Sequence, residues 1–102
     1  MTSVLCAEAD VVEGQIKQEM LDDGTLIALY RVEGQIYATA DTCTHGGSSL
    51  SEEGRLEGQV VECAWHFGRF DIRTGRVCAS PCTIPLRTYP VTVIGGMVNV
   101  DA

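Results

Sequence analysis

Two short segments that each pair a cysteine with a histidine constrain this chain more than any other feature. The first reads Cys43-Thr44-His45 and the second reads Cys63-Ala64-Trp65-His66, with 17 residues between His45 and Cys63. Side chains two positions apart in an extended loop project to the same side of the backbone. Side chains three positions apart can do so around a turn. Two such loops, if they face each other, present two sulfur and two nitrogen atoms to a common centre, so the fold must bring distant segments together.

Paired thiol and imidazole side chains at this spacing indicate a metal site. The candidate ligands are Cys43, His45, Cys63 and His66. A [2Fe–2S] cluster held by two cysteines on one iron and two histidines on the other has unlike ends that match this pattern. One structural zinc ion bound by the same four side chains is the alternative, although zinc modules usually place like ligands together. Packing alone does not account for two mixed pairs that are each followed closely by a glycine, Gly46 and Gly68.

The rest of the chain predicts an all-β fold, because its apolar stretches are short and turn residues are frequent. Two glycines, Gly95 and Gly96, join two β-branched runs and predict a hairpin. A further stretch, residues 11–20, is interrupted by Gly14 and is interpreted as a strand rather than a helix. The other predicted strands cover residues 25–32, 35–40, 60–63, 69–72 and 76–79, and those of the hairpin cover residues 91–94 and 97–100.

The length of 102 residues predicts a single domain, residues 1–102. Its middle differs from its ends, because residues 41–82 hold four of the five cysteines, both histidines and the only tryptophan. We therefore expect a smaller cluster-binding lobe, residues 41–82, inserted into an antiparallel β base that both ends of the chain build together.

The cysteines outside the two pairs are interpreted as packing residues, since cysteine behaves as a small buried hydrophobe. Cys6 is expected to pack from a strand, and Cys78 and Cys82 are expected to be buried. Two phenylalanines, Phe67 and Phe70, are expected in the core of the lobe.

Charge and cysteine usage limit the partners and the compartment. Seven basic against fourteen acidic residues give a net charge of −7, which argues against nucleic-acid binding. The longest apolar run, residues 26–30, is too short to span a membrane. Residues 1–9 lack the basic and apolar regions of a secretory signal. The odd number of cysteines argues against a disulfide scaffold, so we expect a cytoplasmic protein.

The two Cys/His segments resemble the ligand motifs of Rieske [2Fe–2S] proteins. Over nearly the whole chain the sequence looks most like the Rieske-type ferredoxins of multicomponent aromatic-ring dioxygenases, of the biphenyl, toluene, naphthalene and cumene kind. The resemblance implies the Rieske fold and one [2Fe–2S] cluster, with Cys43 and Cys63 on one iron and His45 and His66 on the other. It also implies that Ser80-Pro81-Cys82 forms a loop over the cluster.

The sequence departs from the respiratory and photosynthetic Rieske proteins at three positions. Their loops are joined by a disulfide, whereas Ser48 and Trp65 occupy the matching positions here. Gly68 stands where those proteins have a serine that donates a hydrogen bond to a cluster sulfur. Fewer donors predict a reduction potential at the low end of the Rieske range, roughly −150 mV.

The resemblance further implies a monomeric one-electron carrier rather than an enzyme. Such a carrier receives electrons from an NAD(P)H-dependent flavoprotein reductase and passes them to the terminal Rieske oxygenase of a dioxygenase system. The sequence agrees, because no histidine remains for an oxygenase iron site and no glycine-rich dinucleotide motif is present.

Three alternatives remain open from the sequence. The chain could be the electron-transfer small subunit of another redox enzyme such as nitrite reductase. It could also be a structural zinc-binding interaction module or an iron–sulfur redox sensor.

Overall fold

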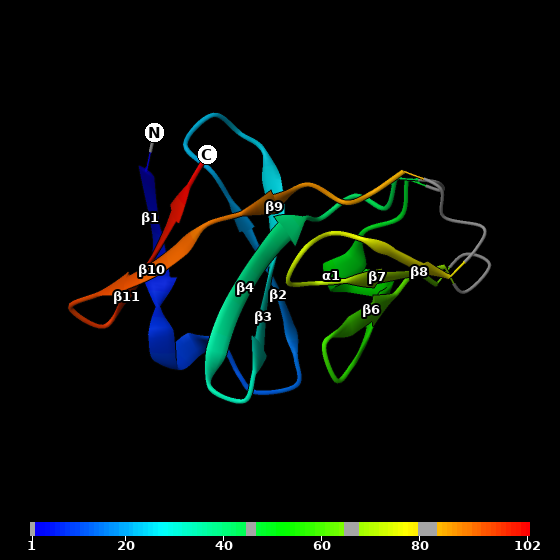
Figure 1. Cartoon of the computed structure of the whole chain (residues 1–102). Coiled ribbons are helices and arrows are strands. Elements are labelled where there is room, and N and C mark those ends of the chain that lie inside the picture. Colours follow the sequence, from blue (N-terminus) through cyan, green and yellow to red (C-terminus); the bar gives the residue numbers. More distant parts are fainter. Residues whose placement is uncertain (1, 45–46, 65–67, 80–83) are drawn as a thin grey trace.

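The computed structural model describes residues 2–44, 47–64, 68–79 and 84–102, and these ranges are dominated by strands (Figure 1). A single turn of 3-10 helix, η1 (Glu8–Asp10), follows the first strand, and a short helix, α1 (Leu50–Glu53), precedes the fifth. The strands are β1 (Thr2–Ala7), β2 (Ile16–Met20), β3 (Leu26–Val32), β4 (Gln35–Ala40), β5 (Arg55–Glu57), β6 (Val60–Glu62), β7 (Arg69–Asp71), β8 (Val77–Ala79), β9 (Thr88–Tyr89), β10 (Val91–Ile94) and β11 (Met97–Asp101).

The strands form three antiparallel sheets. Two of them, with strand orders β1-β11-β10 and β2-β3-β4-β9, make up the part of the molecule called here the base. The third, with order β5-β6-β7-β8, makes up the lobe together with α1. Figure 1 shows the lobe on one side of the base, with both ends of the chain at the other side. The ends are adjacent because Thr2 pairs with Asp101.

Strand β3 is buried on both faces, and it holds the base and the lobe together because its residues contribute to two cores. Ala28, Tyr30 and Val32 point to a core shared with the lobe. Ile27 and Leu29 point to a second core between the two sheets of the base. The alternation follows from the two-residue period of a strand. A nearly continuous apolar run is the pattern expected of a strand that is covered on both sides.

Most of the predicted strands are present, but residues 11–20 form a strand only over Ile16–Met20. Gly14 adopts a φ of 79°, which ends the extended conformation there. The Glu13 side chain instead accepts hydrogen bonds from the backbone N–H groups of Glu33 (2.7 Å) and Gly34 (3.1 Å). This stretch therefore secures the β3–β4 turn, where Glu33 itself has a φ of 52°.

The predicted burial of the spare cysteines is partly wrong. Cys78 is exposed, because β8 lies at the edge of the lobe sheet. Cys6 is partly buried and packs against the base core from β1, as expected. Phe70 is buried in the core of the lobe, also as expected. Cys82 and Phe67 lie outside the described residues.

No helix in the part of the chain that the structure describes is long and apolar enough to cross a membrane.

Candidate metal centre

The first cysteine segment forms a closed loop between β4 and α1. The backbone N–H of Leu50 donates to the carbonyl of Asp41 (2.7 Å), and that of Cys43 donates to the carbonyl of Ser48 (2.9 Å). The N–H of Gly47 returns to the carbonyl of Cys43 (3.0 Å). Gly47 has a φ of 71°, a conformation that glycine adopts without strain. These bonds fix the backbone of Cys43 at the mouth of a tight turn.

The second cysteine segment forms an equivalent loop between β6 and β7. Glu62 pairs with Arg69 in the antiparallel register, and their side chains form an ion pair of 2.9 Å. Just beyond that pair, the N–H of Cys63 donates to the carbonyl of Gly68 (2.7 Å). Both loops are therefore closed in the same way, by a bond from the cysteine N–H to the carbonyl five residues later.

Ser48 brings the two loops face to face. Its carbonyl accepts the hydrogen bond from Cys43, and its hydroxyl Oγ lies 3.1 Å from the Sγ of Cys63. Both cysteines are almost fully buried, at 2% and 0% exposure, in the core that joins lobe and base. The structure thus brings the two predicted cysteine ligands together. In the sequence, Ser48 stands out only because it occupies the position of a disulfide cysteine, and this contact with Cys63 is not predicted.

A third segment reaches the first loop from the end of the lobe. The Thr44 hydroxyl donates to the carbonyl of Ile84 (2.7 Å), and the Ile84 side chain is 60% exposed. The contact places residue 84 beside the Cys43 loop. The predicted covering segment, Ser80-Pro81-Cys82, lies outside the described residues.

The two histidine candidates, His45 and His66, also lie outside the described residues, as does Trp65. By sequence, each histidine falls between a cysteine and the residue that closes its loop. The described donors fit an iron–sulfur cluster, because two buried cysteines share one apolar core and the backbone N–H of each is fixed by a loop-closing hydrogen bond.

A buried carboxylate supports the first loop from below. Asp41 accepts hydrogen bonds from Gln18 Nε2 (2.9 Å), Ser49 Oγ (2.6 Å) and the Ser51 N–H (2.8 Å). Burial raises the pKa of Asp41, but hydrogen bonds from Ser49, Ser51 and Gln18 together outweigh that effect, so the pKa lies below its ordinary value. Because Gln18 belongs to β2, the carboxylate ties the base to the loop that carries Cys43.

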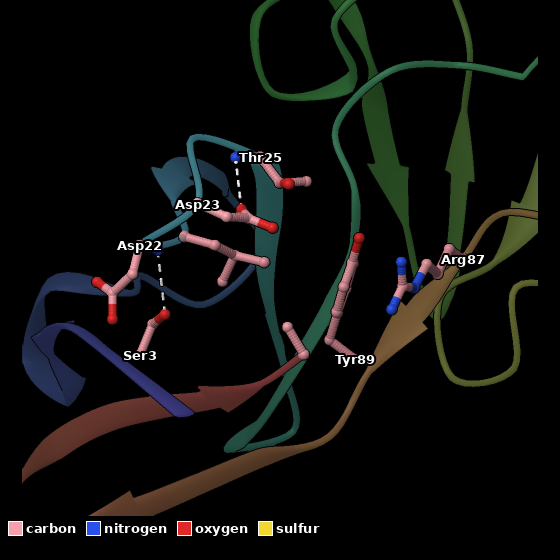
Figure 2. A pocket seen from close by; sticks show the side chains of 8 residues that line it. Ser3, Asp22, Asp23, Thr25, Arg87 and Tyr89 are labelled. Atoms are coloured by element: carbon pink, nitrogen blue, oxygen red, sulfur yellow. Dashed lines mark hydrogen bonds between the residues drawn. The ribbon is translucent and has the colours of Figure 1, made fainter. Parts of the chain in front are cut away.

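A cavity of about 200 Å³ on the base is lined by neither Cys43 nor Cys63, the two predicted ligands that the structure describes (Figure 2). The Asp22 N–H donates to the Ser3 hydroxyl (3.2 Å), and the Thr25 N–H donates to the Asp23 carboxylate (2.9 Å). On the other side, the Arg87 guanidinium lies over the Tyr89 ring, 4.8 Å from its centre. These contacts hold the β2–β3 turn and the approach to β9, so we interpret the cavity as structural.

Comparison with known proteins identifies the family. The Rieske [2Fe–2S] domain family matches residues 1–90. The chain is 58% identical over 97 residues to the ferredoxin component of the p-cumate 2,3-dioxygenase system of Pseudomonas putida. The alignment covers 95% of this chain and 82% of that protein.

Two solved structures extend the match to the fold. The ferredoxin of Sphingomonas yanoikuyae B1 aligns over 100% of this chain and 99% of that chain, with 38% identity and a TM-score of 0.93. A complex of reduced oxygenase and oxidized ferredoxin in carbazole 1,9a-dioxygenase aligns over 97% of this chain and 91% of that chain, with 45% identity and a TM-score of 0.90. The predicted all-β Rieske fold and its single [2Fe–2S] cofactor are confirmed, and the chain belongs to the Rieske [2Fe–2S] family.

Proposed function

We propose that this chain is a one-electron carrier that serves the terminal Rieske oxygenase of an aromatic-ring dioxygenase. Its electrons come from an NAD(P)H-dependent flavoprotein reductase. The observation that carries the proposal is the pair of buried cysteines on facing, identically closed loops, in a chain whose relatives are named as ferredoxin components of dioxygenase systems. The chain is a carrier and not the catalytic subunit.

We assign Cys43 and Cys63 to one iron of the cluster and His45 and His66 to the other. The bound cluster supplies a site that accepts and releases one electron, and its histidine ligands raise the potential above that of an all-cysteine cluster. The chain's own residues position the two sulfurs, because each cysteine N–H is fixed by its loop-closing hydrogen bond. The apolar core around both sulfurs keeps water away from them.

We infer that the lobe presents the cluster to both partners in turn, with residues 41–82 acting as an insertion in one domain of residues 1–102. One feature supports docking at this end. Ile84 is an exposed apolar side chain, and its carbonyl is joined to the Cys43 loop through the Thr44 hydroxyl. A small interface suits a carrier, because it must also leave its partner.

We also propose that the carrier is a monomer that works in the cytoplasm. The free thiols of Cys6 and Cys78 support a reducing compartment. Stable copurification with a large partner would instead favour a resident electron-transfer subunit, such as that of a nitrite reductase.

The test combines cluster analysis with electron transfer. The purified protein should contain two irons and two acid-labile sulfides and should be reduced by NADH only when a flavoprotein reductase is present. It should then reoxidise when a terminal Rieske oxygenase is added. A colourless protein that contains zinc would reject the proposal.

Two variants separate the ligands from the other cysteines. His66→Ala should abolish or cripple cluster assembly, whereas Cys6→Ala should leave the cluster intact because Cys6 packs in β1 on the base. Equal iron and sulfide contents in the two variants would contradict the assigned ligand set.

A further inference from the structure

We propose that the Ser48 hydroxyl donates a hydrogen bond to the Cys63 sulfur when that sulfur is a cluster ligand. The bond raises the reduction potential of the carrier above the value that it would have without the hydroxyl. The inference rests on the proposed function, because it assumes that Cys63 binds the cluster.

The geometry supplies both partners and the direction of the bond. Ser48 Oγ and Cys63 Sγ are 3.1 Å apart, and the two residues are only 8% and 0% exposed. Either atom could be the donor while the sulfur is a thiol. A metal-bound sulfur has lost its proton, so the hydroxyl is then the donor and the sulfur the acceptor.

The position of Ser48 is fixed independently of this contact. Its carbonyl accepts the hydrogen bond from the Cys43 N–H, which closes the first loop. The hydroxyl therefore reaches from the backbone of one cysteine loop to the sulfur of the other. Little conformational freedom is lost when the bond forms, because the loop has already placed the donor.

The neighbouring hydroxyls are engaged elsewhere and make useful comparisons. Ser49 Oγ donates to the Asp41 carboxylate (2.6 Å), and Ser51 Oγ lies 3.1 Å from Ser49 Oγ. Of these three serines, Ser48 is the one whose hydroxyl contacts a ligand sulfur. The contact is thus specific to one side chain in a serine-rich segment.

A donor at this place favours the reduced state. One electron enters the cluster on reduction, and the added negative charge is shared with the ligand sulfurs, while the hydroxyl keeps its proton. A hydrogen bond to an atom that becomes more negative strengthens, and it strengthens more in a buried site than in water. Loss of the hydroxyl should therefore make the cluster harder to reduce.

The primary test is Ser48→Ala in the intact holoprotein, with Ser51→Ala as the matched control. Ser48→Ala should weaken electron affinity about tenfold, which corresponds to a fall in midpoint potential of about 59 mV for one electron. Ser51→Ala removes a hydroxyl from the same segment without touching the sulfur, so its potential should equal that of the wild type.

A second measurement detects the bond itself. Pulsed electron paramagnetic resonance of the reduced protein, in ordinary and heavy water, should show one exchangeable proton coupling in the wild type that is missing in Ser48→Ala. Ser48→Thr keeps a hydroxyl and should keep both the coupling and the potential. Should Ser48→Ala assemble its cluster incompletely, the comparison moves to Ser48→Thr and Ser48→Val, which differ only in the hydroxyl.

Several results would overturn the inference while leaving the proposed function intact. They are an unchanged potential in a fully loaded Ser48→Ala, equal potentials for the threonine and valine variants, or loss of the cluster in Ser48→Thr as well as in Ser48→Ala. A wild-type protein without a Rieske-type signal would instead reject the proposed ligand set.

Discussion

Single buried polar side chains decide how the cluster loops are held. Asp41 is 1% exposed and yet stays charged, because three donors from β2 and the α1 region surround its carboxylate. Tyr30 is fully buried in the core shared with the lobe, and its hydroxyl lies 2.7 Å from Thr39 Oγ1. The Thr39 hydroxyl in turn donates to the Ala40 carbonyl, so Tyr30 is the donor in this chain of bonds.

Asp41→Asn should destabilise the holoprotein by about 2 kcal/mol, because an amide has one acceptor oxygen and directs its own N–H donors at the surrounding donors. The expected result is a fall in the temperature at which the visible colour of the cluster is lost. Asp22→Asn is the control, since Asp22 is exposed and its carboxylate supports no such network. Equal thermal stability of the two variants would show that Asp41 does not brace the loop.

The phenol of Tyr30 should resist ionisation. Burial raises its pKa well above the ordinary value and outweighs the lowering effect of the bond that the Thr39 hydroxyl can donate once the phenol has ionised, while the Asp41 carboxylate adds to the rise. A folded-state pKa above the unfolded one contributes stability that is complete below about pH 10, the ordinary tyrosine pKa. That stability is lost as the pH rises further, because the unfolded chain ionises first.

The measurement is the tyrosinate absorbance as the pH is raised just past 10. The wild type and Tyr30→Phe should show the same increase while both remain folded, because Tyr30 contributes no tyrosinate there. If the absorbance of the wild type rose more than that of Tyr30→Phe, by the amount expected of one tyrosinate, Tyr30 would be ionising and its burial would not protect it.

Among the elements, the longer strands are predicted well, whereas the short strands β5 and β9 and the loops are not. The period of the side chains and the two-glycine turn place β3, β4, β10 and β11 almost as observed, because those strands follow from local patterns. The short helix α1 was not predicted. It depends on the Ser49 side chain, which accepts a hydrogen bond from the Glu52 N–H at its start, and four residues give too little periodicity to detect.

In the candidate metal centre, too, some features could be predicted from the sequence and others could not. Residue types and spacing predict Cys43 and Cys63 as ligands of one metal site, and the structure buries both in one core, with Ser48 joining their loops. The Ser48 contact and the Asp41 network could not be predicted, because each joins segments that are separated in the sequence by 15 and 23 residues. Such contacts depend on the packing of lobe on base, and a serine or an aspartate does not by itself indicate them.

Two glycines with the same backbone conformation should differ in what they tolerate. Gly75 and Gly96 both have a φ of 78°, but a Cβ on Gly75 would lie 1.9 Å from the Leu86 carbonyl oxygen, whereas one on Gly96 meets nothing within 4 Å. Gly96→Ala should therefore cost about 1 kcal/mol, the strain of the left-handed region alone. Gly75→Ala should cost about 2 kcal/mol more, because the bond between Leu86 and Gly75 must also shift.

Thermal unfolding of the two holoproteins, followed by circular dichroism, checks this comparison. Equal midpoints would mean that the turn between β7 and β8 is not pressed against the segment that leads to β9.

At the scale of the whole molecule, charge is concentrated away from the lobe. Residues 1–40 and 83–102 carry eight acidic and three basic side chains, whereas residues 41–82 carry six acidic and four basic ones. The arrangement gives the molecule a negative base and a more nearly neutral lobe. The net charge of −7 speeds the approach of a basic partner, with little effect on the fold.

Electron transfer to the oxygenase should therefore slow as salt is added, because charges more than about 10 Å apart are largely screened at 0.1 M ionic strength. Stopped-flow measurement of oxygenase reduction over a range of salt concentrations tests this. A rate that does not depend on salt would contradict electrostatic steering of the partner, and it would not affect the assignment of the cluster ligands.

We propose above that two cysteines and two histidines of this chain hold one [2Fe–2S] cluster. Pulsed electron paramagnetic resonance of the reduced protein, labelled with ¹⁵N only in histidine, tests it most directly. We expect two strongly coupled histidine nitrogens, both of which are lost together with the cluster in His66→Ala. A reduced cluster with no coupling to histidine nitrogen would contradict it.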